Sequence, residues 1–184
     1  RLTDGDGGRS EAAAAAAVMV TPQNDAPVIS SFPTSVVSYK KQAAPVVVGG
    51  GTVTDADLLD FDGGTILSWL GGADPVHDRL GIKHTGFGAK QIGVDGNQIT
   101  YGTDGTLANA LPVATFSGGV GDDLLVITFN SNARATQVTA VLRAISYSNL
   151  ASNPLTGLRQ VTFLLSDGDG AHAEQVTRNV NLIL

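Results

Sequence analysis

The sequence contains the same short acidic motif near both of its ends. Residues 2–11 read Leu-Thr-Asp-Gly-Asp-Gly-Gly-Arg-Ser-Glu and residues 165–174 read Leu-Ser-Asp-Gly-Asp-Gly-Ala-His-Ala-Glu, so the two segments align without a gap. A segment of strand length follows each copy, residues 12–21 and residues 175–184. Similarity at a fixed long period is the signature of a tandem-repeat architecture. The sequence therefore predicts one complete repeat, preceded by the last strand of another.

The first of these segments opens with a run of alanines, residues 12–17, which in isolation would favour a helix. The equivalent segment, residues 175–184, is rich in β-branched residues and partly alternates apolar with polar residues, as a half-buried strand does. Because equivalent segments of a repeat should share their structure, we expect residues 12–21 to be a strand. A helix is the alternative.

Between the two copies the chain is divided into short segments by turn residues. Its 23 Gly, 7 Pro and 42% apolar residues suit many short strands joined by glycine-rich turns. Asp95-Gly96-Asn97 predicts a tight hairpin, and apolar residues at helical spacing in residues 135–144 predict one short helix, with a bulged strand as the alternative. The expected fold class is all-β with one short helix, with strands at residues 35–39, 45–48, 65–70, 80–84, 91–94, 98–101, 124–129, 145–148 and 160–165.

The charge balance limits the classes of binding partner that the protein can have. The chain carries 17 acidic against 11 basic residues, a net charge of −6, which argues against nucleic acid and anionic membrane surfaces and fits divalent cations better. The absence of cysteine excludes disulfides and Cys-based zinc sites. No apolar run reaches the roughly 18 residues of a membrane helix, so we expect no membrane insertion.

Closely spaced carboxylates follow the β-type stretch at residues 52–54. Asp55 and Asp57 come directly after it, and Asp60 and Asp62 precede Gly63-Gly64. Calcium takes about six to eight oxygen ligands at flexible geometry, so aspartates two residues apart on a loop after a strand can curl around one ion. An ordinary polar turn is the alternative, because Asp and Gly are common in turns.

The segment before the second repeat resembles the linker of cadherin repeats. Residues 22–27 read Pro-Gln-Asn-Asp-Ala-Pro and follow the predicted strand 12–21. Cadherin linkers carry an Asp-x-Asn-Asp-Asn motif followed by proline, and Asn24 and Asp25 match two of its interior ligand positions. The resemblance implies that calcium binds where one repeat joins the next.

Further acidic residues follow the order of the same family. The Asp55-x-Asp57 pair is similar to its Asp-x-Asp motif after a strand, Asp60 or Asp62 could supply a later ligand, and Asp167 is similar to the aspartate in a turn before the last strand. The calcium ligands that the resemblance implies are Asn24, Asp25, Asp55, Asp57, Asp62 and Asp167. Residues 38–42 depart from the family, since Lys40 and Lys41 occur where a glutamate ligand is expected. We therefore expect fewer ions, or weaker affinity, than at a complete cadherin junction.

Nearly the whole chain is similar to the cadherin-like repeats of large bacterial surface proteins, and the similarity is carried by residues 60–64, 78–82, 115–119, 142–149 and 161–163. The resemblance implies an Ig/cadherin-like β-sandwich over residues 29–184, a linker at residues 24–28, and the last strand of a preceding repeat within residues 1–23. It also implies a secreted or cell-surface protein that serves as a stalk or adhesion segment. Its expected partners are neighbouring repeats of the same protein, and further copies of itself through homotypic association.

Other functions are possible for a β-sandwich of this composition. A carbohydrate- or protein-binding module would expose aromatic side chains such as Trp69 or Tyr101 on one face, and a filament subunit could use residues 1–21 as a strand added to a neighbouring subunit. The three histidines belong to no metal or nucleophile motif. We therefore do not expect an enzyme.

Overall fold

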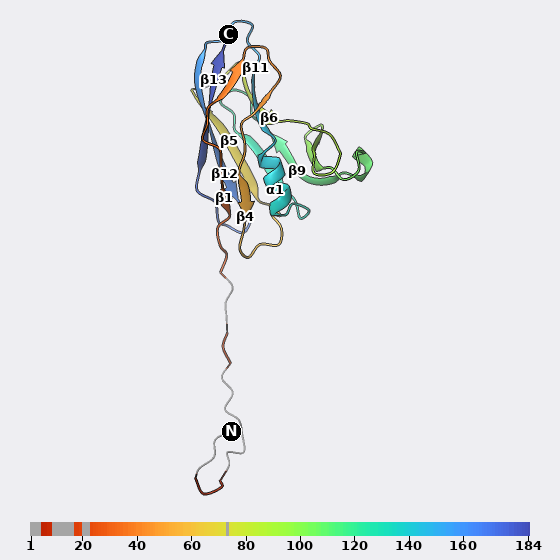
Figure 1. The fold of residues 1–184 in the computed structure, drawn as a ribbon, viewed down its shortest axis with the longest axis vertical. Helices are drawn as coiled ribbons and strands as arrows, with labels where there is room; N and C mark the ends of the chain where they lie inside the picture. The colour runs from red at the N-terminus through yellow and green to blue at the C-terminus, as the bar shows by residue number, and fades with distance from the viewer. Residues whose placement is uncertain (1–4, 9–16, 20–22, 73) are drawn as a thin grey trace.

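An eight-stranded sheet forms one layer of the protein (Figure 1), and the computed structural model describes residues 5–8, 17–19, 23–72 and 74–184. All neighbouring strands of this sheet are antiparallel except β2 and β13, which are parallel. In spatial order the strands are β2 (Val37–Lys40), β13 (Val176–Ile183), β12 (Gly157–Ser166), β5 (Thr65–Gly71), β10 (Leu125–Phe129), β9 (Leu111–Ser117), β8 (Gln98–Tyr101) and β7 (Ile92–Asp95).

Two smaller sheets and a helix form the second layer. One sheet has three strands in the order β3, β11, β6 and the other pairs β1 with β4. Their bounds are β3 (Val46–Val47), β11 (Ile145–Asn149), β6 (Asp78–Ile82), β1 (Val28–Ser30), β4 (Thr52–Thr54) and α1 (Ala135–Leu142). The described part of the chain is therefore an all-β, sandwich-like fold with one short α-helix, as the sequence predicts.

The two layers enclose one hydrophobic core. Alternation along β5 shows how each strand contributes, because Ile66, Ser68 and Leu70 are buried while Leu67 and Trp69 are only partly buried. Fully buried side chains come from both layers, among them Ile66, Ile127, Phe163 and Leu182 from the large sheet and Val53, Leu142, Ile145 and Tyr147 from the second layer.

Helix α1 covers the core beside β4. Val138, Val141 and Leu142 are its buried apolar residues, so the helical spacing recognised in the sequence corresponds to the face packed inward. The helix also satisfies the backbone of β4, because the Thr139 hydroxyl accepts a hydrogen bond from the Val53 amide at 2.9 Å. The helix thus supplies the acceptor that a further strand would otherwise provide to β4.

The strands predicted from residue 35 onward are confirmed with shifts of a few residues at their ends, and the predicted hairpin at Gly96 joins β7 to β8. Strand β9 was not predicted, because Pro112 interrupts its pattern. Proline is tolerated in strands at irregularities, and Pro112 pairs with Thr100 where the register of β8 and β9 shifts. The predicted strand over residues 12–21 lies outside the described residues except for residues 17–19, which belong to no strand.

The β7–β8 hairpin and the segment after it extend away from the sandwich. This segment includes a 3₁₀ turn, η1 (Leu107–Asn109), before the chain returns as β9. In Figure 1 this part of the chain is the green arm beside α1. The arm widens the molecule at the level of α1 and β4. A cleft lies between the arm on one side and α1 and β4 on the other.

Candidate metal centre

The turn after β12 is organised by a buried carboxylate. Asp167 is 1% exposed, and its Oδ1 atom accepts hydrogen bonds from the amides of Asp169, Gly170 and Ala171 at 2.8, 3.0 and 3.0 Å. Burial raises the pKa of Asp167, but the hydrogen bonds from Asn24 and these amides outweigh it, so the pKa lies below its ordinary value. The turn therefore holds an ionised carboxylate at neutral pH.

The linker lies against this turn and against the loop after β4. The Asn24 side-chain amide donates to Asp167 Oδ2 at 2.8 Å, across 143 residues of sequence. One residue later, the Asp25 backbone amide donates to Asp57 Oδ1 at 3.3 Å. Two adjacent linker residues thus connect two separate acidic loops at the end of the sandwich where the chain enters it (Figure 1).

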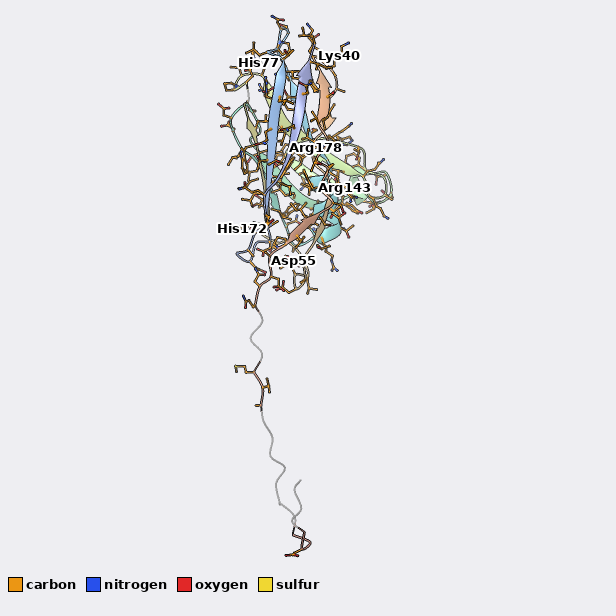
Figure 2. All side chains as sticks on the ribbon, turned by 60° about the vertical axis from the view of Figure 1, so that its left-hand side comes forward. Lys40, Asp55, His77, Arg143, His172 and Arg178 are labelled. Carbon is orange, nitrogen blue, oxygen red and sulfur yellow. The ribbon has the colours of Figure 1, made fainter. Side chains whose placement is uncertain are left out.

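The loop after β4 contains a carboxylate oxygen without a partner. Asp55 Oδ1 accepts from the amides of Asp57 and Leu58 at 3.2 and 3.1 Å, whereas its Oδ2 atom is buried with no hydrogen-bond partner among the described residues. Desolvation raises the pKa of Asp55, and the Asp57 carboxylate raises it further. The negative charge of Asp55 is therefore disfavoured here unless a cation compensates it. Figure 2 labels Asp55 at the linker end.

The next turn, which carries Asp60 and Asp62, packs against the Asp167 turn through its backbone. A Cβ atom added to Gly168 would lie 2.3 Å from the Asp62 carbonyl oxygen, so the two turns are in direct contact. The Asp62 side chain is exposed, and its amide donates to Asp60 Oδ1 at 3.2 Å. All six residues predicted as ligands therefore lie on contacting segments at one end of the molecule.

The contacts join these residues in pairs: Asn24 with Asp167, Asp25 with Asp57, and Asp57 with Asp55. Within the described ranges, no three His, Cys, Asp or Glu side chains are grouped closely enough to hold a metal ion by themselves. A calcium ion here would also draw on the amide oxygen of Asn24, backbone carbonyls and water, which are ordinary ligands of this ion.

The two lysines that depart from the family pattern, Lys40 and Lys41, do not adjoin these loops, and the Lys41 ammonium donates to the Ser152 carbonyl oxygen at 3.5 Å. Figure 2 shows Lys40 at the end of the sandwich opposite Asp55. Lys40 is the last residue of β2, which pairs with the end of β13. Its positive charge therefore does not take a ligand position at the linker end.

The sequence did not indicate a buried polar network that surrounds Asp78. This carboxylate is 0% exposed and accepts from the Tyr147 hydroxyl, from Asn149 Nδ2 at 2.7 Å, from Arg159 Nε at 2.8 Å and from the Asp74 amide at 2.7 Å. Burial raises the pKa of Asp78, but the four hydrogen bonds outweigh it and lower the pKa overall. Because every partner is a donor from the protein itself, this network joins β6, β11 and β12 and is structural.

The side chains of His77 and His84 make local contacts. His77 Nδ1 lies 2.9 Å from Asp74 Oδ2, and His84 Nδ1 accepts from the Val94 amide at 3.0 Å.

The two aromatic residues considered for sugar binding, Trp69 and Tyr101, lie on different surfaces of the protein. Trp69 lies on the outer face of β5, opposite to its buried neighbours, and Tyr101 lines the cleft beside α1.

No helix in the described part of the chain is long and apolar enough to cross a membrane. Comparison with known proteins found no matching family model, no matching curated protein and no matching solved structure.

Proposed function

We propose that residues 29–184 form one cadherin-like repeat of a secreted or cell-surface protein, and that calcium at its linker end restricts bending against the neighbouring repeat. The observation that carries this proposal is the position of the linker. Asn24 and Asp25 each bind a different acidic loop, at Asp167 and Asp57. A linker held in this way could transmit an ion-dependent constraint from one domain to the next.

Repulsion between carboxylates and the desolvation of Asp55 favour the binding of a cation at the linker end. Asp55 and Asp57 lie in one loop, and the linker brings that loop together with the ionised Asp167. Without a cation the Asp55 and Asp57 carboxylates repel one another, and Asp55 Oδ2 is desolvated with no donor among the described residues. A calcium ion bound by the folded protein alone would offset the repulsion and stabilise the fold by mass action.

The role proposed is mechanical or adhesive rather than catalytic. Repeats stacked end to end extend a protein away from a surface, and metal-stiffened junctions would set its reach and the presentation of its outermost repeats. Neighbouring repeats of the same chain are the partners that this role requires, and homotypic contacts between stalks are a further expectation.

Calcium is expected to raise the melting temperature of the wild-type protein. At a calcium concentration about 100 times the dissociation constant, binding adds about 2.7 kcal/mol, or about 5–10 °C for a domain of this size. Asp55→Asn should abolish most of this shift, because it removes the charge while keeping a side-chain oxygen for the amides of Asp57 and Leu58. Thermal unfolding, monitored by circular dichroism, measures the calcium-induced shift in melting temperature for the wild type and for Asp55→Asn.

The calcium-free baseline gives a second readout. Because the pKa of Asp55 is raised in the folded state, its ionisation costs stability above that pKa, so Asp55→Asn should melt no lower than wild type in EDTA at pH 7. Asp122→Asn, in an exposed turn between β9 and β10, is the charge-matched control and should keep the full calcium shift. An unchanged melting temperature of the wild type in millimolar calcium would contradict the proposal.

A further inference from the structure

A cleft of about 650 Å³ lies between helix α1, strand β4 and the arm. Its size is within the range of pockets that hold small organic ligands, which is about 300–1,000 Å³. The side chains around it are Val47, Thr52, Val53, Thr54, Thr85, Lys90, Ile92, Tyr101, Ala135, Thr136, Thr139, Ala140, Arg143 and Ala144. None of these residues belongs to the candidate metal centre.

The cleft is positively charged although the chain is acidic. Lys90 and Arg143 line it, and the lining residues include no Asp or Glu, whereas the whole chain carries a net charge of −6. In the described structure the Lys90 ammonium forms no salt bridge, and neither does Arg143. The cleft therefore presents two uncompensated cations to whatever enters it, and electrostatic complementarity favours an anion.

Arg143 is held in place before any ligand binds. Its Nε atom donates to the Gly51 carbonyl oxygen at 2.7 Å and its Nη2 atom donates to Thr52 Oγ1 at 2.8 Å. The Nη1 atom has no partner among the described residues. A guanidinium fixed by two hydrogen bonds loses little further freedom on binding a carboxylate, which favours recognition of that group.

Lys90 occupies an unusual backbone conformation at the rim of the cleft. Its φ angle is +66°, in the left-handed region that glycine adopts without cost and that other residues adopt at a cost of up to about 1–3 kcal/mol. Such conformations concentrate at functional positions. Lys90 is the third residue of a turn that the Gln91 amide closes by donating to the Gly88 carbonyl oxygen at 2.9 Å, and this turn holds the lysine beside the cleft.

We infer that this cleft binds a sugar that carries a carboxylate, such as a uronic acid residue of an acidic polysaccharide. Lys90 and Arg143 would pair with the carboxylate. The hydroxyls of Thr54, Thr136 and Tyr101, which have no partners among the described residues, would meet the sugar hydroxyls. The apolar wall, which includes Val53, Ile92 and Ala140, and the Tyr101 ring would cover the C–H face of the sugar ring.

An extended acidic peptide fits the cleft less well. Peptides added to a sheet need a free row of backbone donors and acceptors. On β4 the amide of Val53 already donates to Thr139 Oγ1, and the residues of β4 pair with β1 on the other side. The cleft thus offers hydroxyls and cations in place of a strand edge. The inference goes beyond the proposed calcium-dependent function and is independent of it.

Titration of the protein with D-galacturonic acid and with D-galactose tests this inference. Amide chemical shifts recorded in EDTA follow binding at the cleft and keep the result separate from that of the calcium proposal. We expect galacturonate to shift amides of α1, β4 and the arm with a Kd on the order of 1 mM, and galactose to bind at least about tenfold more weakly.

Two variants locate the site. Lys90→Gln should weaken galacturonate binding about tenfold or more while the protein keeps its melting temperature, and Lys40→Gln, at the end of β2, should change neither quantity. The inference is overturned if galactose binds as tightly as galacturonate, or if Lys90→Gln leaves the Kd for galacturonate unchanged. It is also overturned if galacturonate at about 20 times the expected Kd shifts no amide resonances. Binding of an oligoglutamate peptide at the cleft in the absence of galacturonate binding would also overturn it.

Discussion

Replacing Asp78 by asparagine is expected to lower the free energy of unfolding by about 3–5 kcal/mol, the usual cost of removing one partner of a buried ion pair. The carboxylate has no exposed surface, and Arg159, its partner at 2.8 Å, is 6% exposed. An asparagine side chain keeps one acceptor oxygen but places an amide group near donors, leaving the guanidinium buried without a counter-ion. Urea unfolding at neutral pH measures the loss.

The pH dependence of stability provides an independent check on Asp78. Its pKa is lowered in the folded state, so its contribution is fully present above the unfolded value of about 3.9 and is lost as the pH falls through the folded value. The wild type should therefore lose stability in acid more steeply than Asp78→Asn does. Asp123→Asn, in an exposed turn, should remain within about 0.5 kcal/mol of wild type. A loss below about 1 kcal/mol for Asp78→Asn would contradict the network described.

The second large effect is expected at Gly168, in the turn that carries Asp167. Its φ angle is +99°, and an added Cβ would lie 2.3 Å from the Asp62 carbonyl oxygen and 2.8 Å from the Gly64 amide nitrogen. Gly168→Ala therefore combines backbone strain of about 1–3 kcal/mol with overpacking of about 1–3 kcal/mol. Because the clash is with backbone atoms, the two turns must separate, and calcium binding at the linker end should weaken with them.

Gly170, two residues later, separates the two contributions. Its φ angle is +107°, but nothing lies within 4 Å of an added Cβ, so Gly170→Ala carries the backbone strain alone. The free energy of unfolding should fall further for Gly168→Ala than for Gly170→Ala by about 1–3 kcal/mol. Equal losses in the two variants, measured by denaturant unfolding, would show that the turns do not press on each other as described.

Much of the fold could be predicted from the sequence because most strands and the helix have recognisable local patterns of apolar, polar and turn residues. The segment of β8 alternates and is followed by turn residues, and the buried positions of α1 recur at the helical period. Strand β1 has only three residues and begins at Val28, inside the predicted linker. So short a strand exists through its pairing with β4, which no local pattern reveals.

At the candidate metal centre, too, the positions of residues in loops could be predicted from the sequence, whereas most contacts between distant segments could not. Asp55, Asp57 and Asp167 follow strand segments, so their position in loops was predictable. The contact of Asn24 with Asp167 depends on where β12 ends relative to the linker, and the sequence alone suggested it only through a family resemblance. Asp78 precedes the strand predicted at residues 80–84, and nothing in the sequence around it indicates a buried network. Its significance arises from Tyr147, Asn149 and Arg159, which are distant in sequence.

Calcium binding where the linker meets the two acidic loops can be tested by recording amide chemical shifts during a calcium titration. Saturable shifts are expected at Asn24 and Asp25, in the loop of Asp55 and Asp57, and in the turn of Asp167, with much smaller shifts in the turn at Asp122 and Asp123. Calcium shifts that are absent, or that do not distinguish these loops from the Asp122 turn, would contradict calcium binding at the linker end.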